Sequence, residues 1–128
     1  MLLLSALLIT GTVFAHALAA TFGWTSTTHN FGKVRQGKPV TVAYSFTNKG
    51  EAPLLITNAK GSCGCTGVEW PKEAVMPGAT GEVKATFNAA SLGTFNKTVY
   101  VESNAEGGPV TLIFNGEVVA EGSSTEGR

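Results

Sequence analysis

Apolar and polar residues alternate along much of the chain between residues 40 and 119. Val42, Tyr44 and Phe46, for example, are separated by Ala43 and Ser45. A period of two is typical of a β-strand that buries one face. We therefore expect strands at residues 40–47, 54–59, 81–88, 94–103 and 109–119, with an edge strand near residues 24–28 that continues through Phe31 and Val34.

Turn-forming residues separate these segments. Residues 48–51 read Asn-Lys-Gly-Glu and residues 77–78 read Pro-Gly, both typical of turns. Residues 104–108 contain two glycines and predict a hairpin between the last two strands. No segment shows a sustained helical period, so strands follow one another without helices between them. This pattern predicts an all-β fold, an immunoglobulin-like antiparallel β-sandwich of about seven strands.

The start of the chain predicts an N-terminal signal peptide. An apolar run extends from Leu2 to Ala15, and Ala-x-Ala patterns end at Ala17 and Ala19. The run is shorter than the roughly 20 residues of a membrane-spanning helix. We therefore expect cleavage, after Ala19 in preference to Ala17, rather than an uncleaved membrane anchor. The segment lacks the basic residue that usually opens a signal peptide.

These features divide the chain into three parts. Residues 1–19 are the predicted signal peptide, residues 20–120 the predicted immunoglobulin-like domain, and residues 121–128 a polar tail that we expect to be disordered. The protein is then exported, to the periplasm or the extracellular space. It would contact a membrane only through an uncleaved signal segment.

Composition and charge exclude several function classes. Lys and Arg together number nine, as do Asp and Glu, so no basic excess favours nucleic acid. All nine acidic residues are Glu, which disfavours the Asp-rich loops that hold calcium. Only one histidine, His29, lies beyond the predicted signal peptide, which disfavours a Ser-His-Asp triad. We therefore expect a protein that is not an enzyme and has no cofactor.

The motif Cys63-Gly64-Cys65 carries the remaining chemical interest. In a regular strand, alternate Cα atoms lie about 6.5–7 Å apart, at or beyond the limit for a disulfide. Gly64 changes this, because glycine adopts backbone angles that would fold the two thiols together.

Three interpretations of the motif remain open. The first is a tight, strained disulfide, easily reduced and therefore redox-active. The second is a dithiol clamp for a soft metal such as Cu(I) or Zn(II), with His29 or Met76 as further ligands, although nothing in the sequence places either nearby. The third is a structural turn of small residues. Two cysteines this close do not form the inter-sheet bridge of antibody domains, which joins distant strands.

Several motifs together resemble a bacterial exported family of unknown function, the DUF1573 family. Its hallmark is similar to the segment Ser-Cys-Gly-Cys-Thr at residues 62–66. The resemblance covers residues 28–119 and implies a fold akin to major sperm protein and ASPM-SPD-2-Hydin domains, which serve mainly as interaction modules. The other matching segments are residues 30–37, 42–53, 70–71, 77–78, 87–88, 95–98 and 103–105.

Two functional hypotheses follow. The first is a non-enzymatic envelope module with a structural or protein-binding role, whose exposed sheet edge accepts a strand of an unknown protein partner. The alternative is a thiol-redox or soft-metal protein that acts through Cys63 and Cys65.

Overall fold

The computed structural model describes residues 18–120. The disordered tail predicted at residues 121–128 and nearly all of the predicted signal peptide lie outside the described residues. Within residues 18–120, no helix has the length and apolar character needed to cross a membrane.

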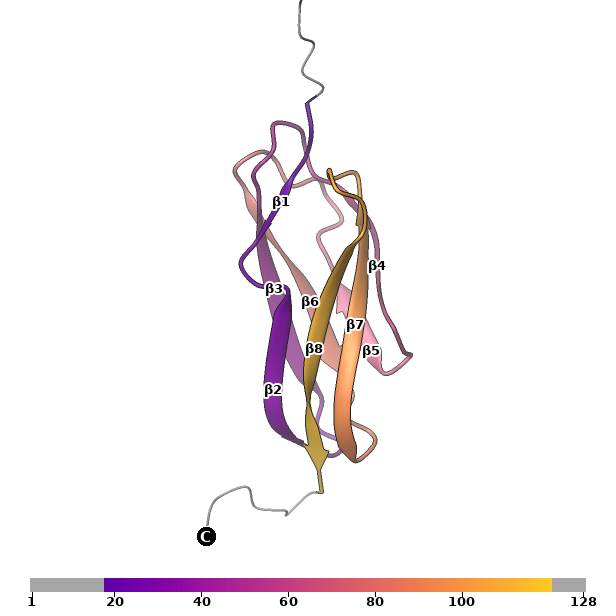
Figure 1. Ribbon diagram of the computed structural model, residues 1–128. Coiled ribbons are helices and arrows are strands. Elements are labelled where there is room, and N and C mark those ends of the chain that lie inside the picture. The colour runs from indigo at the N-terminus through magenta and orange to yellow at the C-terminus, as the bar shows by residue number, and fades with distance from the viewer. Residues whose placement is uncertain (1–17, 121–128) are drawn as a thin grey trace, which may run out of the picture.

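Within the described residues, eight strands form two four-stranded sheets that pack face to face (Figure 1). The first sheet has the order β1-β3-β6-β5 and the second has the order β2-β8-β7-β4. The predicted all-β, immunoglobulin-like sandwich is therefore confirmed. The strands are β1 (Phe22–Trp24), β2 (Thr28–Arg35), β3 (Val40–Asn48), β4 (Ile56–Gly61), β5 (Thr66–Glu69), β6 (Thr80–Phe87), β7 (Gly93–Ser103) and β8 (Val110–Val119).

The N-terminal part of the sandwich crosses from one sheet to the other. Strand β1 pairs antiparallel with the end of β3, whereas β2 pairs parallel with β8. The expected single edge strand is thus two strands, one in each sheet. With β5, which the alternation also does not predict, this crossing brings the strands among residues 18–120 to eight, where the alternation predicts about seven.

The inward faces of both sheets form one apolar core. The alternation predicted along β3, β6, β7 and β8 is confirmed by side chains such as Phe46, Val83 and Phe114, which are almost fully buried. Tyr44 links the two layers, because its hydroxyl donates a 2.7 Å hydrogen bond to the Ile113 carbonyl. Burial raises the pKa of the Tyr44 hydroxyl to about 12.

Buried Asn48 organises the end of the sandwich away from the cysteines. Its side-chain amide donates to the carbonyls of Ala52 and Val75, at 2.8 and 2.9 Å, and its Oδ1 accepts from the Gly50 N–H at 2.9 Å. Asn104 acts at the same end, where its Oδ1 accepts from the Leu55 N–H at 2.8 Å.

Two differences from the expected strands matter for the site. The predicted strand at 54–59 begins only at Ile56, since Leu54 instead forms an isolated bridge with Val75. Strand β5 was not expected, because its four residues include a glycine and carry little apolar pattern. It exists because β6 offers an unpaired edge next to the Cys63-Gly64-Cys65 turn.

Candidate functional site

The Cys63-Gly64-Cys65 motif lies where the chain passes from one sheet to the other. It connects the end of β4, an edge strand of the second sheet, to the start of β5, an edge strand of the first. Both edges lie on the side of the sandwich opposite β1 and β2 (Figure 1). The motif therefore forms a corner between two sheet edges.

Main-chain hydrogen bonds hold both flanks of this turn. On the β4 side, the Ser62 N–H donates to the Thr98 carbonyl at 2.9 Å, and Ser62 Oγ accepts from the Thr98 N–H at 3.3 Å. On the β5 side, the Asn88 N–H donates to the Cys65 carbonyl at 3.0 Å. Each flank is thus fastened to its own sheet without help from the sulfur atoms.

Cys63 and Cys65 form a disulfide, in line with the first of the three interpretations. Their Cα atoms lie 5.3 Å apart, closer than in a regular strand. The Thr66 hydroxyl lies 3.7 Å from Cys63 Sγ and 4.0 Å from Cys65 Sγ. Because disulfide sulfurs carry no proton, the hydroxyl is the donor in both contacts.

The two glycines next to the disulfide have different roles. A Cβ on Gly61 would lie 2.6 Å from the Thr66 Cβ, so glycine is needed where β4 and β5 approach each other. Gly64 differs from expectation, because its φ is not positive. Apart from the two neighbouring cysteines, an added Cβ would meet no atom within 4 Å, so the space beyond the turn is open.

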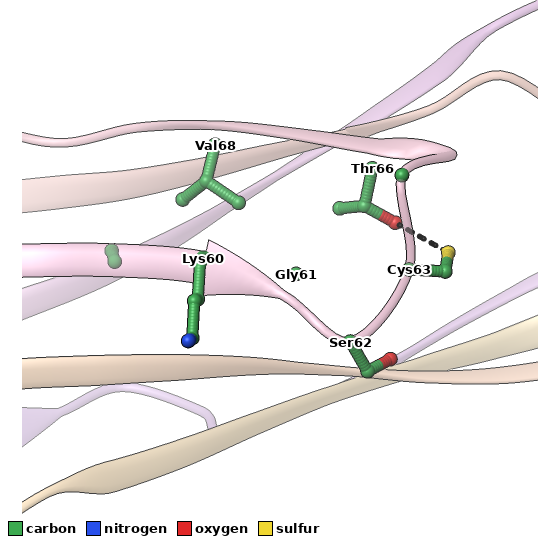
Figure 2. A pocket seen from close by; sticks show the side chains of 8 residues that line it. Lys60, Gly61, Ser62, Cys63, Thr66 and Val68 are labelled. Atoms are coloured by element: carbon green, nitrogen blue, oxygen red, sulfur yellow. Dashed lines mark hydrogen bonds between the residues drawn. The ribbon is translucent and has the colours of Figure 1, made fainter.

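A groove of about 470 Å³ opens between the edges of β4 and β5 and ends at the disulfide turn. Figure 2 shows Val68 and Gly61 along it, with Cys63 and Thr66 at the end formed by the turn. Lys60 also lines it and is exposed.

Main-chain groups of both edge strands face this groove. Backbone groups in an antiparallel strand point alternately toward and away from the neighbouring strand. Ser62 bonds to β7, so the groups of Gly61 and Ala59 point away from β7. Cys65 bonds to the residue after β6, so those of Thr66 and Val68 point away from β6. All four of these residues line the groove.

Cys65 lies on the inner side of the turn and packs against the core cluster. With Lys97 it lines a second pocket, of about 160 Å³. Lys97 belongs to the same face of β7 as buried Phe95 and Val99, because alternate strand residues share a face. A half-buried lysine in the row of β7 that faces the core therefore shares a pocket with Cys65.

Lys97 and Thr66 were not among the residues predicted for the site. The alternation of β7 could have revealed Lys97, since it places a lysine in an otherwise apolar row between Phe95 and Val99. Thr66 could have been noticed only as the neighbour of Cys65, because its contact with both sulfurs depends on the turn.

The structure does not bring the suggested metal ligands to the cysteines. His29 lies on β2, separated from β4 by β8 and β7, and its ring meets Phe31 edge to face. Met76 follows the Leu54–Val75 bridge, at the far end of β4. Among residues 18–120, no group of three or more His, Cys, Asp or Glu side chains is placed to hold a metal ion.

The family follows from a match over most of the chain. The family model described as "Protein of unknown function (DUF1573)" matches residues 22–118, which include the disulfide turn and all eight strands but the last residue of β8. The chain belongs to this family. No curated protein sequence matches it.

Solved structures show the same fold at low sequence identity. A protein of unknown function from Porphyromonas gingivalis W83 has a TM-score of 0.69 and 13% identity, over 84% of this chain and 51% of that one. The PapD-like domain 7 of human CEP192 has 0.62 and 10%, over 80% and 87%. The YadV chaperone has 0.56 and 12%, over 84% and 54%. This DUF1573 chain thus spans about half the length of the first and third structures.

Proposed function

We propose that this protein is a non-enzymatic module of the bacterial envelope that binds an extended segment of a partner protein. The segment adds as a strand along the groove between β4 and β5. The observation that carries the proposal is the direction of the main-chain groups of Ala59, Gly61 and Val68, which point away from the paired strands at residues that line the groove. The Thr66 N–H already donates to the Cys63 carbonyl, at 3.4 Å.

The chemistry of the groove favours a polypeptide as its occupant. Outward N–H and C=O groups of an edge strand are matched by those of another extended chain. The other long edge, β2, is less suitable, because its register shifts in mid-strand, between Asn30 and Lys33, and such irregularities hinder strand addition. The register shift of β4, between Ile56 and Asn58, lies before the residues that line the groove. Strand β1 at the remaining edge has only three residues.

Two further parts of the proposal come from the sequence. The apolar start and its Ala-x-Ala patterns support export. A chain without Asp, and with one histidine beyond the predicted signal peptide, is poorly supplied for a Ser-His-Asp triad. Fractionation of the source cells, with intact-mass measurement of the mature protein, tests the location and the cleavage site.

Strand addition is tested with Val68→Pro and a matched control, Val68→Ala. Both variants remove the branched, half-buried side chain of Val68, but only proline removes the main-chain N–H that points away from β6. In the assay, the full chain captures proteins from an envelope extract. Isotope-labelled cross-linkers and mass spectrometry then identify the captured segment. We expect a partner that wild type and Val68→Ala retain and Val68→Pro loses, with a cross-link from Lys60 to an extended segment.

Binding that survives Val68→Pro in a folded protein contradicts strand addition at this groove. Cross-links that fall only on residues of β2 would place the partner at the opposite edge and contradict it as well. Turnover of a small-molecule substrate by the purified protein would contradict the non-enzymatic part.

A further inference from the structure

The Cys63–Cys65 disulfide has an asymmetric environment. Cys65 packs against the apolar core, whereas Cys63 lies outside that cluster at the end of the open groove. Gly64 carries no side chain that could cover the sulfurs, and the space beside it is open. A thiolate from solvent therefore reaches Cys63 more readily than Cys65.

Two groups lie where they can stabilise negative charge on Cys65. The Thr66 hydroxyl lies 4.0 Å from its Sγ and 3.7 Å from that of Cys63, so it can stabilise either thiolate, and the preference for Cys65 depends on Lys97. Lys97 lines the same pocket as Cys65. It lies in the row of β7 side chains that faces the core, between the apolar residues Phe95 and Val99. A nearby cation and a hydroxyl donor favour the thiolate form of a cysteine, which makes it a better leaving group.

From these contacts we infer that Cys63–Cys65 is a thiol–disulfide exchange site, in which Cys63 is the sulfur attacked and Cys65 is the leaving sulfur. The electron donor is a dithiol, such as a pair of cysteines in another protein. The inference does not depend on strand addition, because a thiol that arrives from solvent meets the same two sulfurs.

The reaction proceeds by two displacements. One donor thiolate attacks Cys63 Sγ, a new S–S bond forms there, and the Cys63–Cys65 bond breaks with its electron pair on Cys65 Sγ. The second donor thiolate then attacks the donor sulfur of this mixed disulfide and releases Cys63 as a thiolate. Two electrons and two protons pass from the donor, which becomes a disulfide, to Cys63 and Cys65, which become thiols.

The fold permits this cycle because the turn is fastened independently of its sulfurs. The bonds from Ser62 to Thr98 and from Asn88 to Cys65 join each flank to its own sheet. Reduction therefore leaves the cysteines close together and ready to be oxidised again.

Trapping of the mixed disulfide tests which sulfur is attacked. The oxidised full chain is treated with reduced glutathione, quenched with an alkylating reagent and mapped by tandem mass spectrometry. We expect glutathione on Cys63 and the alkyl label on Cys65. Glutathione on Cys65, equal amounts on both, or a disulfide that is no more reactive than oxidised glutathione overturns the inference.

The role of Lys97 is tested by titration of a single thiolate. In a Cys63→Ser background only Cys65 remains, and its thiolate absorbance is followed against pH. We expect Lys97→Met to move the midpoint to higher pH and Lys97→Arg to restore it. Lys33→Met is the matched control, because it removes the same charge from an exposed position on β2, the sheet edge away from the disulfide.

The exchange rate completes the test. With both cysteines present, Lys97→Met and Thr66→Val should each slow reduction by glutathione about fivefold, the loss of one hydrogen bond or cation near the leaving sulfur. Lys33→Met should leave the rate unchanged. If Lys97→Met keeps both the wild-type rate and the wild-type midpoint in a folded protein, Lys97 does not stabilise Cys65 and the assignment of the leaving sulfur fails.

Discussion

Replacement of both cysteines with serine tests whether the disulfide stabilises the sandwich. The bond closes a loop of only three residues, Cys63, Gly64 and Cys65. In the chain-entropy model a three-residue loop stabilises the folded state by about 1.6 kcal/mol, against about 4.7 kcal/mol for a 100-residue loop. The bonds that fasten Ser62 and Asn88 do not involve sulfur and remain. We therefore expect Cys63→Ser with Cys65→Ser to lower the free energy of unfolding by no more than about 2 kcal/mol.

Urea unfolding, followed by tryptophan fluorescence, measures this difference. Trp24 is a suitable reporter because its ring packs against Phe46 in the core, with centroids 5.1 Å apart. Wild type in excess reductant is the control and should unfold at the same urea concentration as the double variant. A loss above about 3 kcal/mol, or a transition that is no longer cooperative, would show that the bond is a structural staple. The loop-entropy reasoning would then be wrong.

Three further predictions concern the sandwich. Asn48→Ala should lower the free energy of unfolding by about 3 to 5 kcal/mol in urea titrations, because buried main-chain groups lose their partners; a loss below 1 kcal/mol refutes this. Stability should fall as the pH rises from about 10 to about 12, because the unfolded chain releases the Tyr44 proton before the folded one. Thermal melts of Tyr44→Phe should lack this component. A chain beginning at Leu18 should be more stable, by about 1 kcal/mol, than one beginning at Ala20, because the Ala19 carbonyl accepts from the Glu51 N–H at 2.9 Å; equal melting temperatures would contradict it.

The identity and facing of the long strands follow from the sequence by itself. Side chains of a strand alternate between its two faces, so a period of two marks both a strand and its buried side. That is why the core positions of β3, β6, β7 and β8 could be predicted, as could the hairpin between β7 and β8. The family motifs of DUF1573 added the class of sandwich to this pattern.

Strand partners depended on contacts between residues distant in sequence. Alternation says which face is buried but not which edges meet, so it could not show that β2 runs parallel to β8. For the same reason it missed β5, whose four residues are ordered by pairing with β6.

The candidate site, too, was predicted in part from the sequence and in part only from the structure. The spacing of Cys63 and Cys65 singled them out, but a disulfide, a metal clamp and a plain turn were all compatible with it. Only the tertiary structure joined the two sulfurs, set the Thr66 hydroxyl beside both and placed Lys97 in the pocket of Cys65. The physical reason is that reactivity depends on distances between side chains of different strands, which the folded sandwich alone determines.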